Sequence, residues 1–155
     1  MSLWGGGHRD IHRSIRRQRQ SCIRDRVEAR HPERSNNVKL GRGGIREIEF
    51  LAQVFQLIRG GRDADLRARS TRAVLQSLDD KQLLEPDVVT ELLQAYTFLR
   101  NLEHRLQYLD DAQTHTLPAS DSDQLLVAHM MGYADTAGLL EELGRQRQCV
   151  SIQFD

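Results

Sequence analysis

The sequence predicts an all-α protein, a bundle of five or six helices joined by short loops. Aromatic residues make up only 5% of the chain while Leu and Ile are abundant, which favours helices over a β-sandwich or barrel. Apolar residues also recur at spacings of three and four along most of the chain, the period of a helix that buries one face. A chain of 155 residues is long enough to bury a core as one domain.

Charge is distributed unevenly along the chain, although the net charge is zero. Residues 1–46 contain twelve Lys or Arg and four acidic residues, hence +8, and residues 47–155 carry −8. We therefore distinguish an Arg-rich N-terminal helix and loop, residues 1–36, from a helical bundle, residues 37–155. The split favours docking of the two parts on each other over an anionic partner. No aromatic residue interrupts the arginines of His8–Ala29, so we expect no nucleic-acid binding.

The first half of the chain predicts two helices and at most one strand. His8–Ala29 is an amphipathic helix pattern, and Val38–Leu40 fits a short strand that has no evident partner in this chain. Ile45–Arg59 is a helix with apolar residues on nearly all sides, which predicts a buried element that ends at Gly60. Its polar exceptions form one narrow stripe: Arg46, Glu49, Gln53 and Gln56.

The second half of the chain predicts four further helices from local start and stop signals. Ser70 and Pro86 are typical first residues, and Ser120 with Asp123 resembles a capping box. The expected helices run from Ser70 to about Leu84, over about Asp87–Asp111, from Ser120 to Met131 and over about Thr136–Val150.

The longest of these helices carries a second polar stripe beside its apolar face. The stripe consists of Arg100, Glu103, His104, Gln107 and Asp111. Either stripe could line a groove toward a partner, or form a hydrogen-bonded seam inside the bundle, which is at least as common.

The stretch Val38–Phe50, VKLGRGGIREIEF, is a candidate anion-binding corner. Gly tolerates positive φ and close approach, and the N–H groups at a helix N-terminus attract anions. The residues that would form the corner are Lys39, Arg42, Gly43, Gly44, Arg46, Glu47 and Glu49. The alternative is that this glycine loop, like most such loops, is only a turn.

No complete catalytic or metal-binding set is visible. The chain contains no Gly-x-x-x-x-Gly-Lys-Ser/Thr loop, no His-Glu-x-x-His helix and no Gly-x-Ser-x-Gly elbow. His104 and His115 lie near other polar candidates, yet exposed or structural roles are commoner for such residues. Cys22 and Cys149 lack metal-type spacing, and no apolar run could span a membrane. We expect a cytoplasmic protein without bound metal.

Two long motifs resemble one enzyme family, the glutamine synthetase adenylyltransferases. They are VKLGRGGIREIEFLAQVFQLIRGGR and, later, AYTFLRNLEHRLQYLDDAQTHTLP, in the family's order. The resemblance implies a helical domain that follows a nucleotidyltransferase palm. Glu47 in GGIREIEF resembles the N-terminal, adenylyl-removing half of that bifunctional enzyme, because the other half tends to carry Asp there.

The resemblance also implies what the parent enzyme binds. Its palm would hold Mg²⁺ and ATP or ADP, and its partners would be glutamine synthetase and a PII signal protein. Such a palm is marked by Gly-Ser followed by an Asp-x-Asp pair, and this combination does not occur in residues 1–155. We therefore expect no cofactor bound to this chain and no activity from it alone.

Two other interpretations stay open. The uridylyltransferase that acts on PII proteins has a related loop with two glycines after a Lys, although IEF and QTHTLP fit it poorly. The third is a non-enzymatic interaction module whose Arg-rich helix binds acidic protein or nucleic acid, and the salt dependence of polynucleotide binding would distinguish it.

Overall fold

The computed structural model of the chain describes residues 36–110 and 114–154. Within them the elements are α2 (Ile45–Arg59), the 3-10 helix η2 (Ala64–Arg67), α3 (Thr71–Asp80), α4 (Pro86–Asp110), α5 (Asp121–Met130) and α6 (Thr136–Ile152). The predicted all-α fold is confirmed. The expected helix His8–Ala29 and the candidate residue Asp111 lie outside the described residues.

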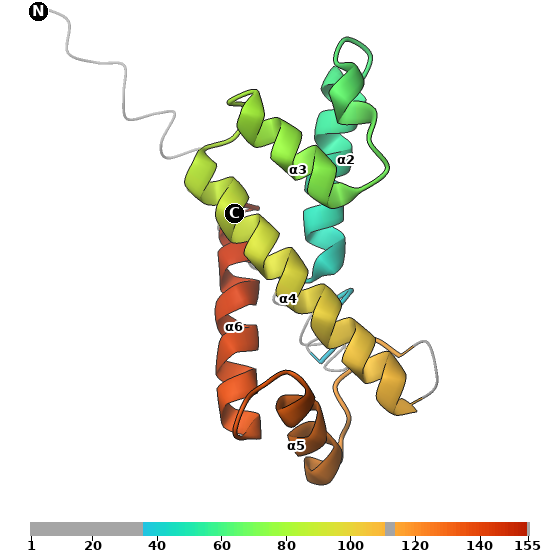
Figure 1. The fold of residues 1–155 in the computed structure, drawn as a ribbon, viewed down its shortest axis with the longest axis vertical. Helices are drawn as coiled ribbons and strands as arrows, with labels where there is room; N and C mark the ends of the chain where they lie inside the picture. Colours follow the sequence, from blue (N-terminus) through green and yellow to red (C-terminus); the bar gives the residue numbers. More distant parts are fainter. Residues whose placement is uncertain (1–35, 111–113, 155) are drawn as a thin grey trace, which may run out of the picture. The chain divides into compact units, whose positions relative to one another are not determined.

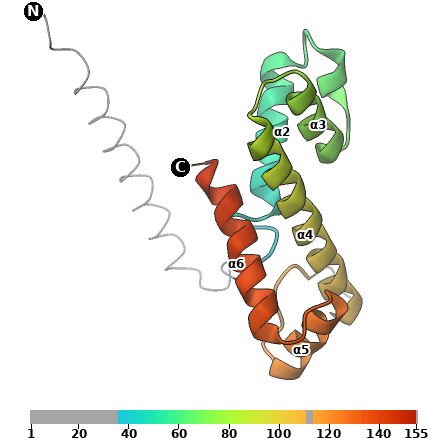
Figure 2. The ribbon, with the colours of Figure 1, turned by 60° about the vertical axis from the view of Figure 1, so that its left-hand side comes forward.

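Helix α4 is the centre of the described bundle. It contacts α2, α3, α5 and α6, with α2 and α3 toward its first half and α5 toward its end (Figures 1 and 2). Its apolar face is almost fully buried, and each member is at most 1% exposed: Val89, Leu92, Ala95, Leu99, Leu102 and Leu106. This face follows the spacing of three and four that the sequence predicted.

The expected end of α3 at Leu84 is wrong by four residues. The helix stops at Asp80, and Gln82 takes a left-handed conformation with φ 53°. The N–H of Leu83 donates to the Leu78 carbonyl and the N–H of Gln82 to the Asp79 carbonyl. This is a Schellman ending, which usually has Gly where Gln82 stands, so no stop signal is visible in the sequence.

The expected capping box at α5 is not formed. Ser120 is the N-cap residue, but its side chain caps no N–H group, and its hydroxyl lies 2.7 Å from that of Ser122. At α6 the cap is Asp135, whose carboxylate accepts a hydrogen bond from the N–H of Gly138 at 2.7 Å.

The expectation that α2 is buried on nearly all sides is also wrong. Ile45, Ile48 and Ala52 enter the core. Phe50, Leu57 and Ile58 remain exposed. Apolar residues therefore lie on two opposite faces of α2, and only one of the faces meets the described part of this chain.

The partner of the segment before α2 lies inside the chain. Asn37 forms an isolated antiparallel bridge with Thr116, and Val38–Leu40 is a turn rather than a strand. The N–H of Val38 donates to the His115 carbonyl at 2.7 Å. The expectation that this segment lacks a partner here is therefore wrong.

Candidate functional site

The loop before α2 is a compact turn that Asn37 organises. The side-chain oxygen of Asn37 accepts hydrogen bonds from the N–H groups of Lys39 at 3.0 Å and Leu40 at 2.7 Å. Its backbone carbonyl accepts another from Gly41 at 2.9 Å. Asn side chains commonly close turns in this way. The turn therefore fixes the backbone position from which the Lys39 side chain extends.

The N–H groups that begin α2 already have partners within the loop. Those of Ile45 and Arg46 donate to the carbonyls of Val38 and Lys39, at 3.2 and 3.1 Å. The N–H of Gly43 donates to the Glu47 carboxylate at 3.0 Å. The corner therefore does not present the free N–H groups of a helix N-terminal anion site, and any charge neutralisation there falls to side chains.

The two buried glycines of the corner serve close packing. Gly43 has φ +66°, and a Cβ atom on it would lie 2.1 Å from the carbonyl oxygen of Arg147 in α6. A Cβ atom on Gly44 would lie 2.7–2.8 Å from three loop carbonyl oxygens. The Arg147 side chain donates to the Asn37 carbonyl at 2.8 Å. The absence of a side chain at Gly43 thus lets α6 rest on the loop, and its absence at Gly44 lets the loop close on itself.

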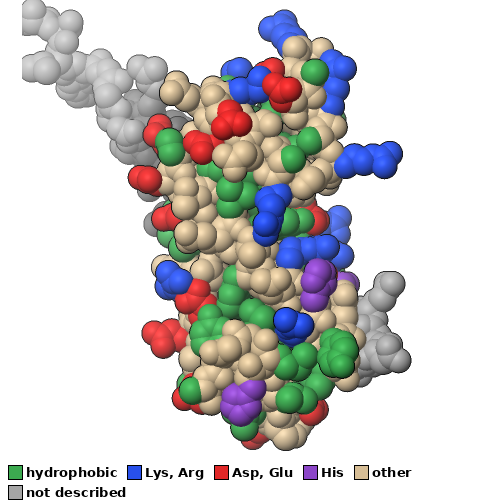
Figure 3. All heavy atoms as spheres, viewed as in Figure 1, with side chains coloured by type: hydrophobic (Ala, Val, Ile, Leu, Met, Phe, Trp, Pro, Cys, Tyr) green, Lys and Arg blue, Asp and Glu red, His purple; other side chains and the backbone are tan. Residues whose placement is uncertain are grey.

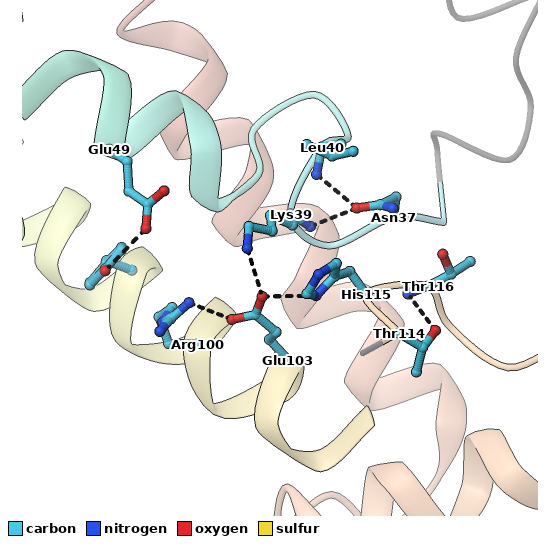
Figure 4. A network of polar contacts seen from close by, with 10 residues as sticks. Asn37, Lys39, Leu40, Glu49, Arg100, Glu103, Thr114, His115 and Thr116 are labelled. Atoms are coloured by element: carbon cyan, nitrogen blue, oxygen red, sulfur yellow. Dashed lines mark hydrogen bonds and ion pairs between the residues drawn. The ribbon is translucent and has the colours of Figure 1, made fainter. Parts of the chain in front are cut away.

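Glu103 of α4 joins the loop to the second polar stripe (Figure 4). Its side chain is only 2% exposed. Arg100 donates to one carboxylate oxygen at 2.6 Å, while the other oxygen lies 2.9 Å from Nδ1 of His115 and 3.7 Å from Nζ of Lys39. A buried carboxylate needs such partners, because burial removes its hydration.

The other candidate site residues do not lie together in the structure. Glu49 approaches the Tyr96 hydroxyl at 3.5 Å, Arg46 and His104 are exposed, and Arg42 and Gln107 are half-buried. Of the second stripe, Glu103 pairs with Lys39 and with its own stripe neighbour Arg100. This arrangement fits the hydrogen-bonded seam more closely than a groove lined by the whole stripe.

The sequence interpretation did not identify the roles of Asn37 and Arg147. The Ser-Asn-Asn run before the glycine loop carried a turn signal for Asn37. Nothing local marks Arg147, because its contact joins residues at opposite ends of the described chain.

Among the described residues, no group of three His, Cys, Asp or Glu side chains is placed to hold a metal ion. Each helix in the described ranges is too short or too polar to cross a membrane.

The chain also matches known sequences. The sequence model of the family described as GlnD PII-uridylyltransferase covers residues 7–155. The chain belongs to this family. Many curated sequences are similar to this family member, and those reported below share one name, "Bifunctional glutamine synthetase adenylyltransferase/adenylyl-removing enzyme". The resemblance read from the two motifs is thereby confirmed.

Three of these relatives are representative. The protein of Nitrosomonas eutropha is 57% identical over 130 residues, 84% of this chain and 14% of that protein. The protein of Ralstonia nicotianae is 59% identical over 119 residues, which are 77% of this chain and 12% of that protein. The protein of Chromobacterium violaceum is 50% identical over 150 residues, which are 97% of this chain and 16% of that protein. The chain thus spans 12–16% of the length of these relatives.

Proposed function

We propose that this chain is the helical domain of a bifunctional enzyme that adenylylates and deadenylylates glutamine synthetase. One observation carries the proposal: relatives of that name are 50–59% identical to 77–97% of the chain. The all-α fold agrees, since the helices would accompany a catalytic palm supplied by another part of the enzyme. The resemblance at Glu47 within GGIREIEF supports placing the domain in the adenylyl-removing half.

The corner before α2 would lie beside the nucleotide. Lys39, Arg42 and Arg46 carry positive charge close together in sequence, and side chains of this kind neutralise phosphate. Glu103 would hold Lys39 in place through their 3.7 Å ion pair. The backbone plays no part, because its N–H groups are bonded within the loop.

ATP or ADP fits this corner only through side chains, and Mg²⁺ finds no set of ligands in the described residues. The cation would therefore be held by the palm. PII signal protein is a further proposed partner of the whole enzyme, with no surface assigned to it here.

The pocket role is tested by the double substitution Lys39→Ala/Arg46→Ala in the full-length enzyme. We expect weaker nucleotide or phosphate affinity and slower removal of adenylyl groups, because two positive charges near the phosphates are lost. A matched control is Arg69→Ala/Arg145→Ala, which removes two exposed charges elsewhere. Unchanged activity and affinity in the first variant would contradict the role.

The need for a palm is tested with the chain alone. We expect no phosphate-dependent release of AMP from adenylylated glutamine synthetase, because residues 1–155 contain no Gly-Ser followed by an Asp-x-Asp pair. Clear turnover by the isolated chain would overturn this expectation.

A second candidate is the helical domain of a PII uridylyltransferase, because the matching family carries that description. The names of the relatives favour the first candidate. Incubation of the full-length enzyme with UTP and PII protein, and with ATP and glutamine synthetase, distinguishes the two. Modification of PII alone would favour the second candidate.

A further inference from the structure

The exposed face of α2 carries a line of apolar side chains, which we call the outer stripe: Phe50, Val54, Leu57 and Ile58. Phe50, Leu57 and Ile58 are 58%, 86% and 73% exposed. Val54 is half-buried, but it is not among the residues packed against the core. Spacings of four, three and one keep these residues along one side of the helix. The largest contiguous apolar patch on a monomer's surface is often a binding site.

The outer stripe is distinct from the face of α2 that builds the core. The core face consists of Ile45, Ile48 and Ala52, which are at most 2% exposed. On a helix, Phe50 and Leu57 project away from that face, because each residue turns by about 100°. The stripe therefore does not stabilise the described bundle, and a second helix packed along it would bury it as ridges pack into grooves.

The charges of α2 indicate what kind of helix fits there. Both carboxylates of α2 are turned to partners of this chain, Glu47 to the N–H of Gly43 and Glu49 to the Tyr96 hydroxyl. The exposed charged residues of α2 are Arg46, which borders the stripe, and Arg59, which lies in the last turn on the opposite side of the helix. In Figure 3, Lys and Arg side chains gather mainly on the side where α2 lies, and Asp and Glu mainly on the opposite side.

The length of the relatives indicates where the partner helix comes from. The chain spans only 12–16% of its relatives, so most of such a protein lies outside the described bundle. Arg46 also belongs to the corner that we place beside the nucleotide, so the stripe begins where the proposed contact with the catalytic part begins. A partner within the same polypeptide binds at high effective concentration, which suits a stripe of only four side chains.

We propose that the outer stripe is a docking face for an acidic amphipathic helix from the remainder of the same polypeptide. Apolar side chains of that helix cover Phe50, Leu57 and Ile58, and a carboxylate of it pairs with Arg46, which borders the stripe. The proposal rests on the proposed function, since it needs a longer enzyme that contains this domain.

The test measures thiol labelling at position 57 by peptide mass spectrometry. Leu57→Cys is introduced with Cys22→Ser and Cys149→Ser, in the isolated chain and in the full-length protein. We expect maleimide to label Cys at this position at least tenfold more slowly in the full-length protein. The matched control is Leu126→Cys on α5, at a side chain that is 46% exposed, where we expect a much smaller difference.

Three outcomes would overturn the docking face. Equal labelling of position 57 in both proteins means that nothing within the polypeptide covers the stripe. Protection of the isolated chain that disappears on dilution means that a second copy covers it. Protection of the full-length protein only after glutamine synthetase is added means that the partner is external.

A charge reversal tests the acidic character of the partner. Arg46→Glu in the full-length protein is expected to speed labelling of position 57 at least threefold, through repulsion between like charges. An unchanged rate would exclude an acidic helix. Because labelling needs no enzyme assay, a protected position 57 in an enzyme that modifies only PII would leave the docking face standing and overturn the proposed function.

Discussion

At the scale of single residues, the carboxylate of Glu103 lies buried among Lys39, Arg100 and His115. It connects the loop before α2, helix α4 and the segment after it. The contacts bring together three stretches that are far apart in sequence, so this residue couples the candidate site to the stability of the fold.

Replacement of Glu103 by Gln should therefore lower the free energy of unfolding. The change leaves positively charged neighbours without a buried counter-charge, which costs about 3–5 kcal/mol when a fully buried pair is broken. Lys39 and Arg100 are each about one-third exposed, and solvent compensates part of the loss, so we expect about 1–3 kcal/mol. Urea unfolding at neutral pH measures it.

The control for this prediction is Glu142→Gln in α6. Hydrogen bonds from Arg145 and then Gln146 lower the pKa of the Glu142 carboxyl. Its partner Arg145 is 66% exposed, so the substitution should cost less than about 1 kcal/mol. That stabilisation is present above the ordinary Glu pKa and is lost as pH falls through the lowered one. A smaller cost for Glu103→Gln than for this control would contradict the role of Glu103.

Alanine substitutions at Gly43 and Gly144 provide a second comparison at the scale of residues. Gly43→Ala adds a Cβ atom 2.1 Å from a backbone oxygen at a positive φ, and should destabilise by about 2–4 kcal/mol. Gly144→Ala places its methyl group in open space within α6, and should stabilise by about 0.5–1 kcal/mol. Thermal unfolding of both variants checks the opposite signs. Equal shifts in midpoint would argue against the contact of α6 with the loop.

At the scale of elements, local signals located helix ends well. The glycines around α2 and the proline before Asp87 marked Ile45–Arg59 and the start of α4 as the structure has them. The end of α3 was missed because Gln82 occupies a position where Gly is usual. Periodicity also could not tell that one apolar face of α2 builds the core and the other does not, since both have helical spacing.

Only part of the candidate site could be predicted from the sequence, because its contacts join segments that are far apart along the chain. The sequence placed Glu103 on a polar stripe and Lys39 in the glycine loop. Their meeting, and the bridge between Asn37 and Thr116, are tertiary contacts that spacing along one segment cannot encode.

The N-cap residues of α5 and α6 should contribute differently to stability, which is a prediction at the scale of elements. Asp135→Ala removes a side chain that accepts a hydrogen bond from Gly138, so it should cost about 1 kcal/mol of unfolding free energy. Ser120→Ala should cost only a few tenths, because Ser120 caps no N–H group at α5. Denaturant unfolding of the two variants gives the comparison. A larger loss for Ser120→Ala would reinstate the capping box expected from the sequence.

At the scale of the whole described bundle, α4 is the only helix among residues 36–110 and 114–154 that contacts each of the other four α-helices. Helix α3 meets α4 and α2, α5 and α6 meet α4 and each other, and α6 also meets α2. Stability of α3 and α6 is therefore coupled through the apolar face of α4 and through α2. A bundle arranged in this way should unfold as one cooperative unit.

Leu99→Ala tests that coupling at the middle of α4. The side chain is fully buried, so its truncation should lower the free energy of unfolding by about 2–5 kcal/mol through lost burial and a cavity. If the bundle is one unit, native-state hydrogen exchange should show the same loss of protection in the most stable amides of α3 and α6. A control, Leu140→Ala, removes a leucine of α6 that is 42% exposed, and should change little. Loss of protection in α6 without loss in α3 would mean that α4 joins two separately stable halves, and that the loop before α2 could then move relative to α6 without unfolding the rest.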